Sequence, residues 1–209
     1  MKVIAWNSQD KCVADYHKLI RGCDVLCLLD CGQWVVPAHA LQIQNGLFHW
    51  KNEHEGFSYD IFYCLEKVAF ICRGGLYSGE SVLYSIHSSI GPLIGIRLQD
   101  DFWLFANHEP NWINACHIGE FYLREISGRF RKAAFIVDFK EKSYSWAQET
   151  VGKLYCISPP EGYRPHTINC LFAIHIACTD LCLLEGYSEA SNQPTFFKSV
   201  SYTHLTLPT

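Results

Sequence analysis

Two adjacent apolar runs in the middle of the chain predict a pair of β-strands joined by a tight turn. The runs are Leu93–Leu98 and Phe102–Ala106, and the polar residues Gln99-Asp100-Asp101 separate them. A strand, a short polar turn and a second strand are typical of a β-hairpin. Pro110 follows the second run and cannot extend the strand ladder. We therefore expect His108 at the end of a strand, on the rim of a sheet.

Continuous apolar runs predict further strands on both sides of this hairpin. The first two, Lys2–Trp6 and Val25–Leu29, flank a segment with helical spacing, Cys12–Arg21. A strand–helix–strand start predicts parallel strands that end at one edge, with Asn7 beside Asp30. The other predicted strands are Ser58–Cys64, Lys67–Cys72, Ser81–His87, Ala133–Val137, Lys153–Ile157 and Thr167–Ala177. Helices are predicted over Trp112–Ile126 and Tyr144–Val151, and Gln33–His54 is predicted as a loop that leaves room for a short helix.

Composition limits the classes of protein to consider. The 209 residues are 49% hydrophobic and 18% charged, which predicts one domain with a substantial two-layer core. No apolar run approaches the roughly 20 residues of a membrane-spanning helix, and the start of the chain has no signal-peptide pattern. The formal net charge of −4 gives no general attraction to nucleic acid, so phosphate binding requires a local cluster.

The cysteine pattern favours a reducing compartment. The 11 cysteines lie mostly inside apolar runs, and their number is odd. No pair of close CxxC motifs has the downstream spacing of a zinc site. We interpret the cysteines as small buried hydrophobic residues and expect a cytoplasmic protein. A disulfide framework is the alternative.

Polar residues stand at the ends of four predicted strands. They are Asn7, Asp30, His108 and Asp138. Any one of them can be a simple strand terminus, but a carboxylate beside an amide suits a divalent cation, and an imidazole suits proton transfer. Arg97, on the strand that precedes the His108 strand, adds a guanidinium that can bind phosphate. Together these residue types predict metal-assisted phosphoester chemistry.

The order of these motifs resembles the exonuclease–endonuclease–phosphatase superfamily, which includes pancreatic-type deoxyribonuclease. The matching motifs are Ala5-Trp6-Asn7, Leu29-Asp30, the segment GPLIGIRLQDDFWLFANHE and Asp138-Phe139. That segment is most similar to the cytolethal distending toxin B subunit, whose form is RPxxGIRIxxxxFFxxHA. The resemblance covers most of residues 2–178. It implies an α/β fold, a four-layered sandwich of two packed mixed β-sheets flanked by helices.

The resemblance also implies a Mg²⁺-dependent phosphoesterase, most simply a deoxyribonuclease-like endonuclease. Its substrate would be DNA, a phosphoinositide or a small phosphate ester. Asn7 and Arg97 would bind phosphate, and Asp30 would bind Mg²⁺ or another divalent cation. His108 would be one of two catalytic histidines. Asp138 would orient the attacking water.

Three positions depart from the family pattern. Asp30 stands where the family has a longer glutamate, and an Mg²⁺ site of near-fixed ~2.1 Å geometry is sensitive to that change. Lys140 replaces the asparagine of a Gly-Asp-Phe-Asn motif, and Asn169 replaces the aspartate of a later Leu-Asp-Tyr motif. These changes leave two hypotheses open: a weakened or altered enzyme, or a catalytically inactive member that binds a partner. A cysteine hydrolase based on Cys116-His117 has little support, because consecutive helical residues point about 100° apart.

The end of the chain differs from the family as well. Residues 201–209, SYTHLTLPT, resemble a translated sequencing adapter. We therefore assign residues 1–198 to a single domain and 199–209 to a tail that is not native. The family's closing Ser-Asp-His is then absent, and His204 matches it only by position. The rival interpretation is that His204 is native and its aspartate partner was lost. The toxin branch is secreted, which conflicts with the cytoplasmic expectation.

Overall fold

In the computed structural model, the described part of the chain consists mostly of β-strands. The structure describes residues 1–7, 20–32, 35–53, 56–64, 67–85, 90–108, 117–118, 121, 124–125, 129–130, 132–139, 154–156, 168–175 and 195–198. The strands are β1 (Lys2–Asn7), β2 (Val25–Leu29), β3 (Leu41–Gln44), β4 (Leu47–Asn52), β5 (Phe57–Cys64), β6 (Val68–Arg73), β7 (Tyr77–Tyr84), β8 (Leu93–Leu98), β9 (Phe102–Asn107), β10 (Lys132–Phe139), β11 (Leu154–Cys156), β12 (Ile168–His175) and β13 (Thr195–Lys198). A short 3₁₀ turn, η3 (Gln99–Asp101), joins β8 to β9.

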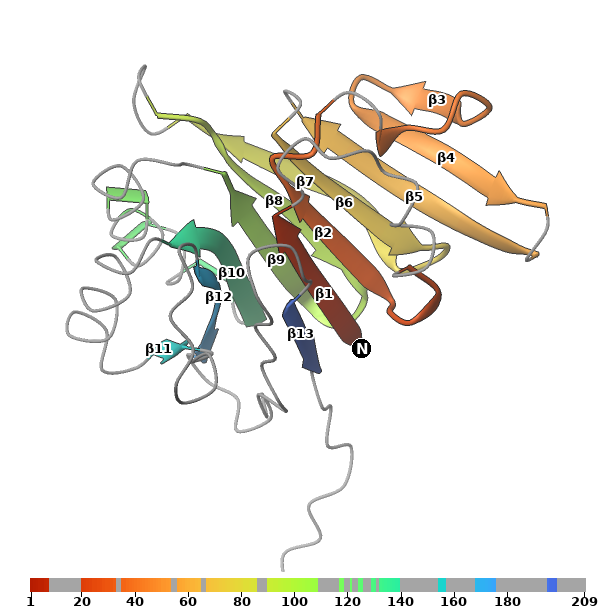
Figure 1. Ribbon diagram of the computed structural model, residues 1–209. Coiled ribbons are helices and arrows are strands. Elements are labelled where there is room, and N and C mark those ends of the chain that lie inside the picture. Colours follow the sequence, from red (N-terminus) through yellow and green to blue (C-terminus); the bar gives the residue numbers. More distant parts are fainter. Residues whose placement is uncertain are drawn as a thin grey trace, which may run out of the picture.

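The strands form two mixed sheets (Figure 1). The first has the order β13-β1-β2-β6-β5-β4-β3 and the second has the order β11-β12-β10-β9-β8-β7. Parallel pairing occurs between β1 and β2 and between β9 and β10, and the other pairs are antiparallel. The carboxyl ends of β1 and β2 therefore share one edge of the first sheet, and those of β9 and β10 share one edge of the second.

One apolar core joins the two sheets. Alternate residues of β2 and β6 face alternate residues of β8 and β9, as the two-residue period of a strand requires. The buried members from the first sheet include Val25, Cys27, Leu29, Val68 and Phe70, and those from the second include Ile94, Ile96, Leu98, Leu104 and Ala106. Face-to-face packing of this kind confirms the predicted pair of stacked sheets.

The predicted helical layers lie mostly outside the described residues. Residues 20–21, 117–118 and 121 are helical. Tyr144–Val151 and most of Cys12–Arg21 and Trp112–Ile126 lie outside the described residues, as do residues 199–209. The four-layered arrangement and the domain assignment stay predictions. No helix in the described part of the chain is long and apolar enough to cross a membrane.

The prediction of a loop over Gln33–His54 was wrong. This stretch contains the antiparallel hairpin of β3 and β4, which extends the first sheet at its edge. Gly46 turns the chain with a φ of 75°, and its carbonyl accepts the N–H of Tyr63 at 2.7 Å. The signal was the Asn45-Gly46 dipeptide between alternating residues, a strong hairpin marker. Strand β13 was not predicted either, and β7 begins and ends earlier than the predicted Ser81–His87.

The cysteine prediction holds where the structure describes the side chains. Among the five cysteines whose side chains the structure describes, none forms a disulfide. Cys23, Cys27, Cys31 and Cys72 are buried, and Cys64 is partly buried. Burial raises the pKa of the Cys27 and Cys72 thiols. These thiols are therefore packing residues.

Candidate active site

The first part of the site is the end of the parallel pair β1–β2. The backbone of Asn7 pairs with Leu29, so Asn7 lies at the same edge as Asp30, the next residue after β2. This confirms the predicted proximity at the level of the backbone. Asp30 leaves the strand with a φ of 49°, a conformation that aspartate tolerates better than most residues. The carboxylate of Asp30 is thereby presented at the rim of the sheet, 28% exposed.

His108 reaches this carboxylate from the other sheet. It directly follows β9, whose alternate residues Leu104 and Ala106 lie in the core between the sheets. The side chain of His108 is 7% exposed, and its Nε2 lies 3.6 Å from Asp30 Oδ1. The separation is too long for a hydrogen bond but short enough for electrostatic contact. An almost buried imidazole and a carboxylate thus lie in electrostatic contact across the two sheets.

Lys67 is the third side chain at this point, and sequence analysis did not identify it. Its Nζ lies 3.1 Å from Asp30 Oδ1. The pairing of Leu29 with Val68 sets Lys67 directly across from Asp30, and the Asp30 N–H donates to the Lys67 carbonyl at 2.6 Å. Facing residues on antiparallel strands share one side of a sheet, so their side chains meet. Asp30 therefore has a lysine partner that its own strand pairing provides.

Two further predicted residues lie next to His108 by backbone register. Asn107 pairs with Val137 in the parallel pair β9–β10, so Asp138 is beside His108. Asp138 pairs in turn with Asn169 on β12. The strands thus bring Asp30, His108, Asp138 and Asn169 to the same edge. Lys140 lies outside the described residues.

Asn107 is a second polar residue that sequence analysis did not single out. It is 1% exposed, and its Nδ2 donates to the carbonyls of Gly91 and Pro92, each at 2.9 Å. Among the described residues, no donor reaches its Oδ1. The amide fixes the segment before β8 against the end of β9. Asn107 therefore helps to set the backbone from which His108 projects.

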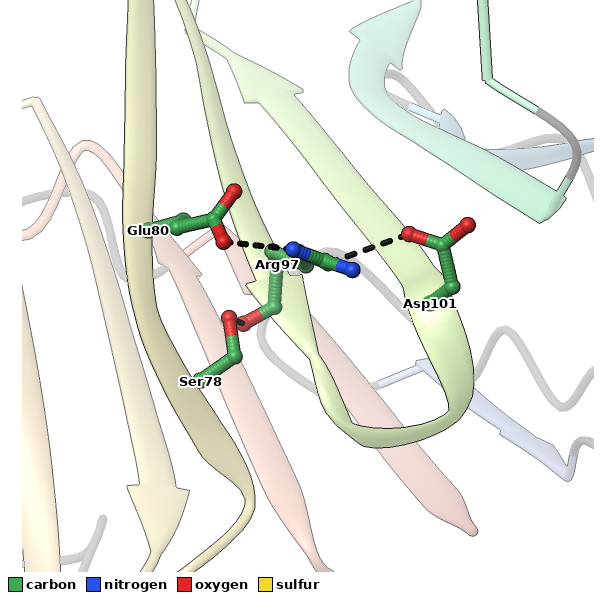
Figure 2. A network of polar contacts seen from close by, with 4 residues as sticks. All are labelled: Ser78, Glu80, Arg97 and Asp101. Atoms are coloured by element: carbon green, nitrogen blue, oxygen red, sulfur yellow. Dashed lines mark hydrogen bonds and ion pairs between the residues drawn. The ribbon is translucent and has the colours of Figure 1, made fainter.

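The structure does not bring Arg97 to this site. Arg97 pairs with Trp103, which is five residues before His108, or about 16 Å along an extended strand. Its guanidinium lies between two carboxylates, Glu80 at 2.5 Å and Asp101 at 3.0 Å (Figure 2). Ser78 Oγ donates to the Arg97 carbonyl at 3.0 Å. This network clamps the β7–β8–β9 turn region, and the phosphate-binding role of Arg97 stays a prediction without support from its position.

A divalent cation at Asp30 has to fit these contacts. Mg²⁺ binds carboxylate oxygens at about 2.1 Å and prefers six oxygen ligands. Asp30 Oδ1 already faces the ammonium of Lys67 and the imidazole of His108. Within the described residues, no group of three or more His, Cys, Asp or Glu side chains is arranged to hold a metal. The described side chains around Asp30 thus do not fit the cation that the sequence resemblance implies.

Comparison with solved structures identifies the fold. The chain is similar to CdtB, the biologically active subunit of cytolethal distending toxin, with a TM-score of 0.62 and 16% identity over 93% of this chain and 96% of that one. It is similar to TDP2 of D. rerio complexed with a single-strand DNA product, with a TM-score of 0.55 and 8% identity over 95% and 99%. It is also similar to an endonuclease/exonuclease/phosphatase from Beutenbergia cavernae, with a TM-score of 0.54 and 12% identity over 94% and 70%.

These likenesses confirm, at the level of the fold, the resemblance predicted from the sequence. No family model matches the chain, and no curated protein sequence matches it either. Identities of 8–16% establish the arrangement of the strands and not the chemistry. Function therefore has to be argued from the residues at the edge where the two sheets meet.

Proposed function

We propose, for a chain with this deoxyribonuclease-like fold, that the edge around His108 and Asp30 hydrolyses phosphate esters, with DNA phosphodiesters as the first substrate to test. The observation that carries the proposal is the 3.6 Å contact between His108 Nε2 and Asp30 Oδ1. It joins an acid–base group and a carboxylate from different sheets, at the edge where Asp138 also lies. The DNA product in the TDP2 complex supports the choice of DNA.

The reaction adds one water across a P–O ester bond. The water oxygen bonds to phosphorus, and the ester oxygen leaves with a proton from the imidazolium of His108. The remaining water proton passes through solvent and recharges the imidazole. Asp30 contacts the imidazole from the first sheet in this scheme. Asp138 orients the attacking water in this proposal, as the sequence resemblance implies.

Mg²⁺ is not part of this reaction scheme. The resemblance implies Mg²⁺ at Asp30, but the ammonium of Lys67 already lies 3.1 Å from Oδ1 of that carboxylate. The proposal therefore uses only groups of the chain, and divalent cations enter as a variable of the assay.

The test is turnover by the full chain on supercoiled plasmid and on bis-(p-nitrophenyl) phosphate, with Mg²⁺ and with EDTA. We expect His108→Asn to lower kcat by about 10²–10⁴-fold, the usual worth of general acid–base catalysis. The matched control is His49→Asn, because His49 Nδ1 also contacts an aspartate, Asp60, at 2.9 Å, but between β4 and β5. The control variant should keep the wild-type rate.

Two results would count against hydrolysis at this site. The first is equal loss of rate in both histidine variants, which would mean that the imidazole of His108 has no special role. The second is a folded wild-type chain without turnover on either substrate. That result would favour the alternative of an inactive member of the fold, and plasmid binding by the same chain would then be measured.

A further inference from the structure

Lys67 is held in place at Asp30 by the backbone as well as by charge. The Lys67 N–H donates to the Cys64 carbonyl at 3.1 Å, and the Lys67 carbonyl accepts from the Asp30 N–H at 2.6 Å. The next residue pairs with Leu29 in the ladder of β2 and β6. The position of Lys67 is therefore a consequence of strand register, and its ammonium reaches Asp30 Oδ1 at 3.1 Å.

The charges at Asp30 leave little attraction for a second cation. The oxygen that contacts Lys67 also lies 3.6 Å from His108 Nε2. A divalent cation bound to this oxygen at about 2.1 Å would lie close to the Lys67 ammonium, and the two like charges would repel each other.

We propose that Lys67 is the resident cation of this site and takes the place of a divalent metal ion at Asp30. Lys67 neutralises the carboxylate, so the pair carries no net charge, and its ammonium lies at the edge where a phosphate group would bind. The ammonium carries three N–H donors on a flexible side chain, so it can contact the carboxylate and a phosphate group at the same time. This inference rests on the proposed function for the statement that the site binds phosphate. It concerns cation binding, however, and can be tested without measuring turnover.

The test is a titration of the full chain with Mn²⁺, a paramagnetic substitute for Mg²⁺, in which the signal of the unbound ion is followed by electron paramagnetic resonance. The wild type is compared with Lys67→Met, Lys67→Arg, Asp30→Asn, Lys67→Met with Asp30→Asn, and Lys51→Met. Lys51 is the matched control because it is an exposed lysine on β4. Lys67→Gln repeats the measurement if the methionine variant does not fold.

We expect that neither the wild type nor Lys51→Met binds Mn²⁺ at this site when the ion is present at millimolar concentration. Lys67→Met should gain one site with at least tenfold higher affinity, and the added Asp30→Asn should remove it. Lys67→Arg keeps the positive charge and should behave like the wild type. The inference is overturned if the wild type binds one Mn²⁺ that Asp30→Asn alone removes, or if a folded Lys67→Met or Lys67→Gln gains no affinity.

Turnover separates the two proposals. Hydrolysis by the wild type in EDTA, abolished by His108→Asn, supports both. Hydrolysis that requires Mg²⁺ overturns the role of Lys67 and leaves the phosphoesterase in place. The expected Mn²⁺ results without any turnover support the role of Lys67 and overturn the phosphoesterase.

Discussion

Asn107 Nδ2 lies 2.9 Å from the carbonyl oxygen of Gly91, and this contact joins the segment before β8 to the last residue of β9. A second bond from the same nitrogen reaches Pro92. Pro92 and Gly91 are the first and second residues before β8, and His108 directly follows Asn107. A single buried amide thus connects the two strands of the central hairpin at the end away from their turn.

Replacing Asn107 should destabilise the chain in a way that depends on charge. We expect Asn107→Ala to lower the free energy of unfolding by about 1–3 kcal/mol, because two partly buried carbonyls lose their donor. Asn107→Asp should cost more at neutral pH, since a buried carboxylate would face two carbonyl oxygens, and the loss should shrink as acid protonates it. Urea unfolding at pH 5 and pH 7 measures both effects.

The matched control for that prediction is Asn45→Asp. Asn45 is exposed in the turn between β3 and β4, where aspartate is equally suited to the turn. Its effect should stay within about 0.5 kcal/mol. If Asn107→Asp is no more harmful than Asn45→Asp at pH 7, the buried amide does not have the structural role assigned to it.

Arg97→Met should change stability slightly and turnover hardly at all. The partners of Arg97 are more than half exposed, 57% for Glu80 and 51% for Asp101. Exposed ion pairs contribute about 0–1 kcal/mol each, so the network should be worth at most about 2 kcal/mol. The kcat and KM of the phosphodiesterase assay should stay within about twofold of the wild type, because the guanidinium lies far from His108. A tenfold rise in KM would restore the phosphate-binding role that the sequence resemblance implies.

The hairpin itself already contains the information that separates Arg97 from His108. A tight turn over Gln99–Asp101 pairs Leu98 with Phe102, and therefore pairs Arg97 with Trp103. Arg97 is then near the turn and His108 is at the opposite end. Sequence analysis predicted the two strands correctly but did not follow their register to its consequence. Counting along the ladder would have removed Arg97 from the site.

Lys67 could not be found by such counting. It acts on Asp30 only because β6 lies beside β2 in the first sheet, and 37 residues separate the two along the chain. The sequence shows two apolar runs and no local signal that they pair. By contrast, the approach of Asn7 to Asp30 follows from short connections and the parallel strand–helix–strand rule. Local patterns thus predicted the approach of Asn7 to Asp30, and long-range strand pairing brought Lys67 to the same carboxylate.

Two buried thiols predict a loss of stability at alkaline pH. Burial raises the pKa of Cys27, as does the proximity of Cys31 and Cys72, and burial and the charge of Asp60 raise that of Cys72. In the unfolded chain these thiols ionise near pH 8.5. Above that pH the unfolded state releases protons that the folded state keeps, so the free energy of unfolding falls as pH rises, by up to about 1.4 kcal/mol per pH unit for each thiol.

Urea unfolding of the reduced protein at pH 7, 8, 9 and 10 measures this slope. The double variant Cys27→Ala and Cys72→Ala should be less stable at pH 7, because two buried sulfurs leave small cavities. Its stability should fall less steeply above pH 8.5, by up to about 2.7 kcal/mol per pH unit relative to the wild type. The other titrating groups are common to both proteins, so the difference in slope isolates the thiols. Identical slopes from pH 8 to pH 10 would mean that the two thiols ionise as readily in the folded chain as in the unfolded one.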